Sequence, residues 1–396
     1  MRKKPSLTYV LSHPIQYISP LLRSLSQKCN LEVYYFSDAS VRGAFDKGFG
    51  RKVVWDVPLL DGYQSKFVKN LSPYDTVSNR FFELINPDIL GQLRKSNAEI
   101  VVVNGWMYFS FVFTMIAAKL LGKQLWLRAE NPLHQELRKR GWVLSLKKIL
   151  LGRLIFPMVD RFLYIGSHSK AFFEYYGVKP GQLIYTPYSV DNERFAHDYE
   201  TLRSQRAALR QELGIPADAK VILSTAKYIT PKRPLDLLAA FAQLNLPNAC
   251  LVMVGDGPMR GEMESFIAKE SLQNVYLTGF VNQSHIPKYY AVADVFVLCS
   301  GMGETWGLSV NEAMNFALPV CVSNTCGCSA DLVQNNVNGF TFNEGDVAAL
   351  AESLRRTLTD EVFRKEAGAA SQRLIKPYSI DTIVTNLLNA ATDSAN

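Results

Sequence analysis

The sequence predicts an α/β protein made of two similar, doubly wound parallel-sheet domains, one after the other. Short buried strands alternate with helical stretches along the whole chain, which is the order that produces parallel sheets. The 396 residues exceed the roughly 250–300 over which a single hydrophobic core grows, so two domains are expected. Hydrophobic residues make up 48% and charged residues 20%, which is ordinary for a globular protein.

Five apolar runs in the first half are predicted strands, because each is followed by a turn or a polar segment and then by a helical pattern. They span residues 7–12, 31–37, 100–105, 124–130 and 161–167. Helices are expected between them, for example over 18–27 and 107–121. The uncharged stretch 100–118 is long enough to cross a membrane, but Asn104-Gly105 interrupts it. That interruption favours a strand, a turn and a buried helix.

The second half repeats the pattern, with predicted strands at 220–228, 249–257, 274–280, 295–300 and 318–323. We expect an N-terminal domain over 1–195 and a C-terminal domain over 196–375. Residues 376–396 should form an amphipathic helix that crosses back to the N-terminal domain, followed by a frayed tail. Ligands of open parallel sheets bind beyond the carboxyl ends of the strands, so the two domains should face a central cleft.

Positive charge is concentrated in the first half. Residues 1–190 contain 26 Lys and Arg against 13 Asp and Glu, whereas the remainder contains 17 against 23. The first half is therefore expected to meet something anionic. Nucleic acid is not the expected partner, because the basic residues form no recognisable binding module. The six cysteines lie mostly in apolar runs without a disulfide framework, which fits a cytoplasmic protein.

A basic loop follows the first predicted strand of the C-terminal domain. It contains Lys227, Lys232 and Arg233 and opens into a predicted helix over 235–244. A helix N-terminus has free N–H groups and partial positive charge, so such a loop suits a phosphate group. The alternative is a solvated basic loop without a ligand.

The next two strands end in residues that allow a ligand to approach. Gly255 and Gly257 permit tight turns and close backbone approach, although glycines at such places often only make turns. Phe280 and Val281 follow the next strand at the same edge, where a flat apolar ring and free backbone groups could hold a nucleobase.

The segment GMGETWGLSVNEAM joins a predicted strand to a predicted helix over 308–317 and contains two carboxylates. Glu304 would reach the group beyond a bound diphosphate, whereas Glu312 lies where a carboxylate could bind ribose hydroxyls. The structural alternative is that Glu304 caps the helix and Glu312 is exposed. The N–H donors for the diphosphate are expected from the loop and the first helical turn, at Thr305, Trp306, Gly307 and Leu308.

Together, these residues resemble the E-x7-E motif and its accompanying motifs in the retaining family-4 glycosyltransferases of the GT-B fold. The matching order covers about residues 219–345 and includes Gly255-Asp256-Gly257-Pro258 and Asn338-Gly339-Phe340. The resemblance implies a GT-B fold with two Rossmann-like domains. It also implies that Glu304 holds donor-sugar hydroxyls, that Glu312 binds the nucleotide ribose, and that Lys227 and Lys232 neutralise the diphosphate.

The sequence departs from the family pattern at several positions. Lys227 stands where arginine is common, which keeps the charge but loses the bidentate fork. Arg233 stands where glycine is usual, and Cys326-Gly327-Cys328 replaces a glycine pair. Many family members have two glycines after the first strand. This chain has HPIQY there instead and so resembles a bacterial-type subgroup.

The first domain is expected to supply the acceptor side of the site. His13 follows the first strand and is a catalytic candidate, with a structural turn histidine before proline as the alternative. Many relatives have a histidine that touches the donor sugar, and here Glu130 or Asn131 would fill its space, with Glu130 as the catalytic candidate. The residues expected on the acceptor side are Gln16, Asn104, Trp106 and Asn131.

The predicted activity is retaining transfer of a sugar from a nucleotide-diphosphate sugar to a saccharide or lipid-linked saccharide acceptor. The resemblance suggests a role in cell-surface polysaccharide or lipopolysaccharide assembly. Charge grows on the leaving diphosphate, and pre-positioned cations and N–H groups stabilise it. No DxD-like acidic pair accompanies the matched motifs, so we expect neither a metal nor another cofactor. The alternatives are a nucleotide-sugar epimerase or a phosphorylase of the same fold, or a non-catalytic nucleotide-sugar-binding protein.

A further stretch, Arg138–Leu151, is basic and amphipathic. Such a helix can lie on an anionic bilayer surface. This would suit a lipid-linked acceptor and a peripheral position on the inner face of the plasma membrane. The alternative is a buried helix with a solvated basic flank.

Overall fold

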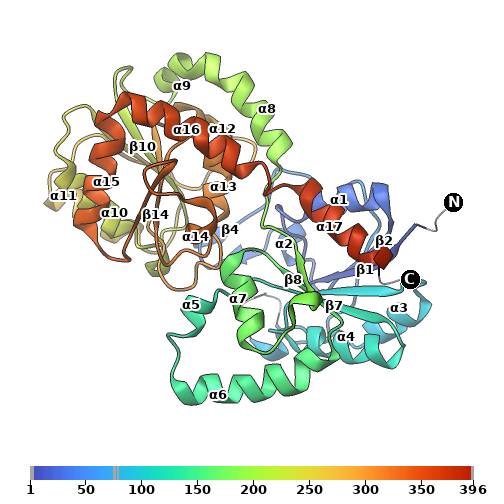
Figure 1. Ribbon diagram of the computed structural model, residues 1–396. Coiled ribbons are helices and arrows are strands. Elements are labelled where there is room, and N and C mark those ends of the chain that lie inside the picture. The colour runs from blue at the N-terminus through green and yellow to red at the C-terminus, as the bar shows by residue number, and fades with distance from the viewer. Residues whose placement is uncertain (1–3, 75–76, 78–79, 394–396) are drawn as a thin grey trace. The chain divides into compact units, whose positions relative to one another are not determined.

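The computed structural model describes residues 4–74, 77 and 80–393, and it divides into two compact units. The first unit contains the chain up to Phe45, Val53–Tyr188 and the chain from Ile380 onward. The second unit contains Asp46–Lys52 and Ser189–Ser379. Figure 1 shows the units with the chain coloured from its N-terminus to its C-terminus.

A seven-stranded sheet forms the centre of the first unit, in the order β5-β2-β1-β6-β7-β8-β9. All six pairings between neighbouring strands are parallel. The strands are β1 (Ser6–Leu11), β2 (Asn30–Tyr35), β5 (Ser65–Phe67), β6 (Ile100–Asn104), β7 (Gln124–Ala129), β8 (Arg161–Tyr164) and β9 (Leu183–Tyr185). Each of the five predicted strands is present, and the edge strands β5 and β9 are additional.

Successive residues of the central strands point to opposite faces of this sheet, as the pleat requires. Val101 and Val103 pack into one core together with Phe111 and Met115, whereas Ile100 and Val102 pack into another. Both faces are therefore buried, which explains why the strands are continuous apolar runs. The helices of this unit are α1 (Ser19–Lys28), α2 (Ala39–Arg42), α3 (Ile89–Lys95), α4 (Phe109–Leu120), α5 (Leu133–Glu136), α6 (Gly141–Ile149), α7 (Ser167–Tyr175) and α17 (Ile380–Asp393), with shorter turns η1 (Phe81–Glu83), η2 (Leu150–Ile155), η3 (Phe156–Met158) and η4 (Pro180–Gln182).

The C-terminal helix α17 returns to the first unit. Its residues Ile383, Val384 and Leu387 share a core with Leu21 and Leu25 of α1, and Figure 1 shows the two helices side by side. The predicted frayed tail includes residues 394–396, which lie outside the described residues. No helix in the described part of the chain is long and apolar enough to cross a membrane.

A six-stranded parallel sheet forms the centre of the second unit, in the order β12-β11-β10-β13-β14-β15. The strands are β10 (Lys220–Thr225), β11 (Ala249–Val254), β12 (Val275–Leu277), β13 (Val295–Leu298), β14 (Val320–Ser323) and β15 (Gly339–Phe342). The helices are α8 (Asn192–Leu202), α9 (Arg206–Glu212), α10 (Pro234–Leu244), α11 (Arg260–Lys269), α12 (Ile286–Val292), α13 (Leu308–Asn315), α14 (Ser329–Leu332), α15 (Val347–Thr359) and α16 (Glu361–Ile375), with short 3-10 turns η5 (Arg203–Gln205) and η6 (Thr230–Lys232).

The prediction of two doubly wound parallel sheets is confirmed, but several strands end earlier than predicted, and the edge strand β15 was not predicted. Residues 226–228 and 255–257 were expected to extend β10 and β11, and the structure has them in loops. Gly255 and Gly257 have φ angles of 154° and 155°, outside the range of an ordinary strand. The chain passes from the first unit to the second between Tyr188 and Ser189. The sequence placed the domain boundary between residues 195 and 196.

Candidate functional site

The second unit brings two of the predicted loops to one point of its sheet. The strands β10 and β13 are neighbours, and the order of strands along the sheet reverses between them. The basic loop follows β10, and the glycine-rich loop with Glu304 follows β13. Since carboxyl ends of parallel strands meet at one edge, both loops lie at the switch point, where ligands of open α/β sheets bind.

Lys232 and Glu304 are in direct contact at this switch point. The Nζ atom of Lys232 donates to Oε2 of Glu304, and both side chains are mostly buried. The two residues that the sequence assigns to the diphosphate and to the donor sugar are thus joined by an ion pair. Lys232 ends the turn η6, immediately before the helix α10.

Arg233 has a left-handed backbone, with φ 50° and ψ 49°. This is the position where the resembled family usually has glycine, and the conformation explains that preference. The arginine is held there by hydrogen bonding to Asp236 (Nε–Oδ2, 2.6 Å) and by Glu344 at 3.6 Å. The loop therefore keeps the family's backbone shape without the family's glycine.

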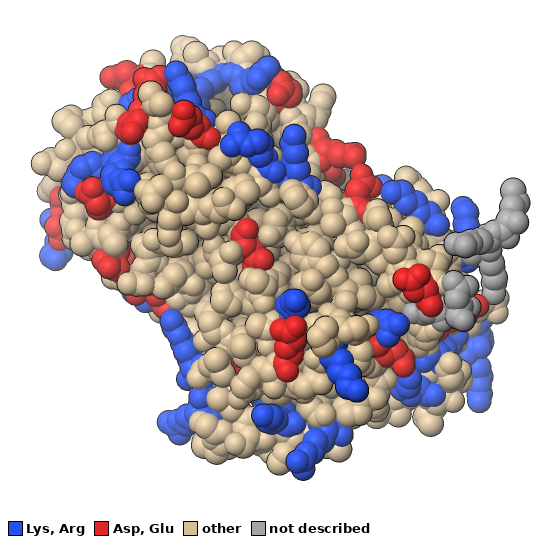
Figure 2. All heavy atoms as spheres, in the orientation of Figure 1, with Lys and Arg blue, Asp and Glu red and all other residues tan. Residues whose placement is uncertain are grey.

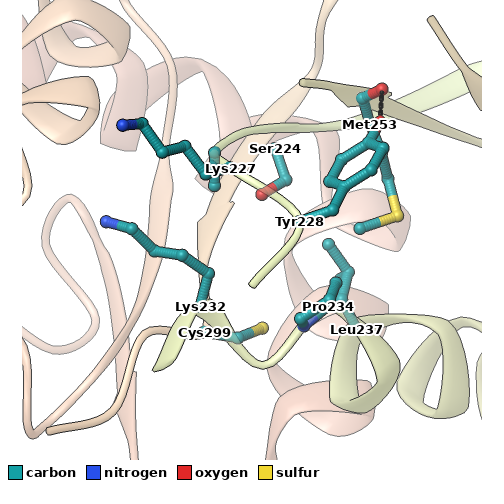
Figure 3. Close-up of a pocket in the computed structure, with 9 residues that line it drawn as sticks. Ser224, Lys227, Tyr228, Lys232, Pro234, Leu237, Met253 and Cys299 are labelled. Atoms are coloured by element: carbon teal, nitrogen blue, oxygen red, sulfur yellow. Dashed lines mark hydrogen bonds between the residues drawn. The ribbon is translucent and has the colours of Figure 1, made fainter. Parts of the chain in front are cut away.

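Lys227 and Lys232 present their ammonium groups on the same side of a small pocket (Figure 3). The neighbouring Tyr228 turns away, because its hydroxyl donates to the Met253 carbonyl at 2.6 Å (Figure 3). Lys227 Nζ is bound by both carboxylate oxygens of Asp46, at 2.9 and 2.8 Å. No local sequence pattern indicates this pairing, because the two residues are 181 positions apart.

The glycine-rich loop turns into α13 at Gly307, whose φ of 104° needs a residue without a side chain. Thr305 and Leu308 are half-buried beside it. Trp306 is buried instead, and its indole N–H donates to Asn311 at 2.8 Å. Only the backbone of Trp306 can therefore serve the predicted donor contact. Gly327 packs so closely on this loop that a Cβ atom would lie 1.8 Å from the Thr305 carbonyl oxygen.

Glu312 is buried rather than exposed, so the exposed alternative for this residue is wrong. The hydroxyl of Tyr290 donates to its Oε2 at 2.6 Å, and Tyr290 is in turn 2.8 Å from the Thr225 hydroxyl. Burial raises the pKa of Glu312 to about 7, against opposing effects of Tyr290 and Arg194. The side chain is thus a fixed acceptor that changes charge near neutral pH.

Gly255 and Gly257 support the basic loop by close backbone contact. A Cβ atom on Gly255 would lie 1.9 Å from the Ala226 carbonyl oxygen, and one on Gly257 would lie 2.6 Å from that of Tyr228. Phe280 and Val281 are half-buried at the same edge. The Phe280 ring is contacted by Phe49 and by Arg51, two residues that the sequence did not indicate.

In the first unit, His13 follows β1, and its Nδ1 lies 2.9 Å from the Ser12 hydroxyl. Burial lowers the pKa of His13 to about 4, so the ring is neutral at pH 7. It can act there as a hydrogen-bonding group but not as a cation.

Glu130 belongs to a buried cluster at the end of β7. The Tyr188 hydroxyl donates to Glu130 at 2.7 Å and lies 2.9 Å from the Tyr17 hydroxyl. Arg128 is 3% exposed, with its guanidinium 4.9 Å from the centre of the Tyr188 ring and 3.6 Å from Glu130. Arg128 lies on β7 two residues before Glu130, whereas Tyr17 and Tyr188 come from distant loops and carry no motif, so the sequence did not indicate them as partners.

The four acceptor-side candidates differ in what their side chains do. Gln16 and Asn131 are half-buried. The Asn104 Oδ1 atom is buried and has no hydrogen-bond partner among the described residues. The Trp106 ring stacks on Phe172, with 6.0 Å between ring centres, so it contributes to the packing of the core.

The part of the chain that the structure describes contains no group of three His, Cys, Asp or Glu side chains that could hold a metal ion. Cys326 and Cys328 are both buried thiols, and burial raises their pKa values well above the ordinary range. They are therefore neutral and packed, which is not the thiolate form that binds metals.

Residues 205–374 match the family described as "Glycosyl transferases group 1". The second unit thus contains a glycosyltransferase group 1 domain, and the family-4-like resemblance of the two-glutamate segment is confirmed. The HPIQY segment as a subgroup marker stays a prediction.

Three relatives illustrate the extent of the similarity. The chain is 32% identical to the sulfoquinovosyl transferase SQD2 of Arabidopsis thaliana over 209 residues, 52% of this chain and 39% of the relative. It is 26% identical over 298 residues to an alpha-1,4-N-acetyl-D-galactosaminyltransferase of Campylobacter jejuni whose name includes a PP-undecaprenol-linked saccharide, covering 73% and 75% of the two chains. The crystal structure of Anabaena HepE with UDP and glucose superposes with a TM-score of 0.74 at 18% identity, covering 99% and 100%.

At 18% identity the HepE comparison establishes the fold, which is GT-B. The chain spans about half or less of the length of several curated relatives that it matches.

Proposed function

We propose that this protein is a retaining glycosyltransferase that moves a sugar from a nucleoside-diphosphate sugar to a saccharide or lipid-linked saccharide acceptor. The observation that carries this proposal is the contact of Lys232 with Glu304 at the switch point, beside the N-terminus of α13. Buried Glu312 lies just over one turn into the same helix. A group 1 domain and a relative named for a PP-undecaprenol-linked saccharide support the same reading.

In this proposal the chain itself stabilises the leaving diphosphate. Lys227, Lys232 and the backbone N–H groups at the start of α13 supply positive charge where negative charge develops. These groups make a metal unnecessary, so we propose a metal-independent reaction. Glu312 accepts hydrogen bonds from ribose hydroxyls, with Tyr290 fixing its orientation.

Glu304 orients the donor sugar and is not the nucleophile. Its ion pair with Lys232 holds the carboxylate at the end of the diphosphate site. By the family resemblance, the acceptor attacks from the face that the diphosphate leaves, and a phosphate oxygen takes the acceptor proton. This order leaves the configuration of the anomeric carbon unchanged.

The helix α6 supports a membrane-bound acceptor, because its apolar side faces outward. None of its residues is buried, and Trp142 is 66% exposed. Leu146, Ile149 and, in the π-helical turn η2, Leu154 continue the same exposed stripe at helical spacing. A helix of a soluble protein normally turns such a stripe toward the core.

The opposite side of α6 is held to the first unit by an ion pair between Lys147 and Glu136. Glu136 is 2% exposed and accepts hydrogen bonds from Lys147 (2.8 Å), Lys139 (2.7 Å) and the Tyr176 hydroxyl (2.9 Å). Burial raises the pKa of Glu136, but these hydrogen bonds outweigh it, so the pKa is lowered overall. Lys139 and Lys147 are thus engaged within the protein.

Exposed cations remain beside the apolar stripe, at Arg140, Lys148 and Arg153. Figure 2 shows Lys and Arg side chains gathered over the α6 region. Apolar side chains flanked by cations match an anionic bilayer surface. We therefore propose that α6 and η2 dock on such a surface at the inner face of the plasma membrane, where a lipid-linked acceptor would lie.

The proposed function is tested by a thermal-shift screen with UDP-, GDP-, ADP- and dTDP-sugars. A rise in melting temperature with one nucleotide class identifies the donor. Incubation of that donor without an acceptor then distinguishes the epimerase alternative, which would convert the nucleotide sugar to its epimer. Stabilisation by none of the four classes would contradict the proposal.

A further inference from the structure

The segment Asp46–Lys52 belongs to the second unit, although the chain on either side of it belongs to the first. It includes most of a two-stranded ribbon of β3 (Phe45–Asp46) and β4 (Arg51–Lys52). Asp46 shapes the connecting turn, because its Oδ1 accepts hydrogen bonds from the N–H groups of Gly48 (2.8 Å) and Phe49 (3.1 Å). The turn is therefore pre-formed, with a carboxylate at its base.

This carboxylate lies on the cation assigned to the donor diphosphate. Lys227 donates to both oxygens of Asp46, and its Nζ lies 4.6 Å from the centre of the Phe49 ring. The carboxylate is an anionic hydrogen-bond acceptor, as a phosphate group also is. Asp46 thus gives Lys227 the kind of contact that the donor would give it.

The same segment covers the residue assigned to the nucleobase. The edge of the Phe49 ring meets Phe280, with 4.9 Å between ring centres and an interplanar angle of 79°. The Arg51 guanidinium lies 5.2 Å from the centre of the Phe280 ring. The Gly48 carbonyl oxygen lies 2.8 Å from the position that a Cβ atom on Gly257 would take.

We infer that Asp46–Lys52 is an internal competitor of the donor, occupying the diphosphate contact with Asp46 and the base contact with Phe49 and Arg51. This inference rests on the proposed function of the site. A donor then binds by breaking the Lys227–Asp46 pair and displacing Phe49 from Phe280. Because both contacts must be replaced, the segment favours ligands with a diphosphate and a base over either part alone.

The inference is tested by calorimetric titration of UDP, GDP, ADP and dTDP into the full-length protein and two variants. Asp46→Asn removes the negative charge that pairs with Lys227 and keeps an amide oxygen for the turn. We expect it to bind the preferred nucleotide about 2- to 5-fold more tightly, the effect of losing a partly exposed ion pair. Phe49→Ala should also tighten binding, because it uncovers Phe280.

The matched control is Asp61→Asn, which changes the net charge equally at an exposed position outside the segment. It should leave the affinity unchanged, and amide hydrogen exchange of residues 46–52 in the wild type should rise when nucleotide binds. Unchanged or weaker binding by both Asp46→Asn and Phe49→Ala, with a wild type that binds, would overturn the inference and leave the proposed function standing. Absence of binding of all four nucleotides to every form would overturn both.

Discussion

The hydroxyl of Tyr290 donates a 2.6 Å hydrogen bond to the buried carboxyl of Glu312. Tyr290 comes from α12 and Glu312 from α13, so the bond links the helix that precedes β13 in the chain to the helix that follows it. It satisfies one carboxyl oxygen in a site that solvent barely reaches. The Glu312 side chain, which is predicted to bind the ribose, is therefore held in one orientation before any nucleotide binds.

The raised pKa of Glu312 predicts a pH-dependent stability. The pKa is about 7 in the folded protein against an ordinary 4.5, so the neutral carboxyl favours folding below pH 4.5 and this contribution is lost as the pH rises through 7. The loss is on the order of 3 kcal/mol. Comparison of urea unfolding at pH 5 and pH 8 should show that Glu312→Gln loses less stability than the wild type over this range. An identical pH dependence in both proteins would contradict the burial argument.

Donor affinity should depend on the same pair. Glu312→Ala is expected to raise the KM for the donor while changing kcat little, because ribose binding serves the ground state and the transition state alike. Tyr290→Phe should raise KM less, since the carboxylate remains but loses its orienting bond. Steady-state kinetics with the donor found by thermal shift measures both. A fall in kcat with an unchanged KM would show that Glu312 acts in the chemical step instead.

Glu304→Gln should reduce sugar transfer about 10²-fold or more, the scale for losing a key transition-state contact. The amide keeps the size of the side chain but no longer pairs with Lys232 as an ion. Initial rates of product formation give the comparison, with Glu262→Gln on the exposed face of α11 as the control. Transfer at the wild-type rate by Glu304→Gln would remove this residue from the site.

Lys232→Ala should weaken binding of the nucleoside diphosphate about 10-fold or more, because a hydrogen bond between charged groups is lost. The wild-type affinity should fall with added salt, since the site relies on charge.

We expect activity to persist in excess EDTA, because cations of the chain do the work of a metal. Activity abolished by EDTA and restored by Mg²⁺ would contradict the metal-independent mechanism.

The outward apolar stripe of α6 predicts membrane binding. Replacement of Trp142 and Leu146 by serine should reduce sedimentation with anionic vesicles by about 10-fold or more, given roughly 1.5–3 kcal/mol for burying each large apolar side chain. Val362→Ser, which changes an exposed apolar residue of the second unit, is the control and should bind like the wild type. A wild type that does not sediment with anionic vesicles at low salt would rule out the docking surface.

The sequence predicted the sheets well because both faces of each sheet are buried. Strands such as β6 and β11 are then continuous apolar runs, which few other structures produce. The edge strands β5 and β9 escaped prediction because they are short and only partly buried. The strand ends at Thr225 and Val254 were also missed, since the loops that follow still contain apolar residues or glycine.

The site was predictable only where one segment holds several of its residues. Glu304 and Glu312 fall in one loop and helix, and Lys227 and Lys232 in another, so spacing reveals both groups. Tyr290, Tyr188 and Asp46 join the predicted residues through contacts between distant segments, which no local pattern records. Arg233 was predictable in part. The sequence shows that an arginine stands where the resembled family usually has glycine, and the structure shows that the backbone there is left-handed.

The central claim is that Lys227, Lys232 and Glu312 serve one nucleoside diphosphate. The most direct measurement is a crystal structure of the protein with the nucleotide that stabilises it most. We predict its phosphate oxygens about 3 Å from the two lysine Nζ atoms and from the first N–H groups of α13, with the ribose on Glu312. Density for the phosphates at any other place on the chain would contradict the account.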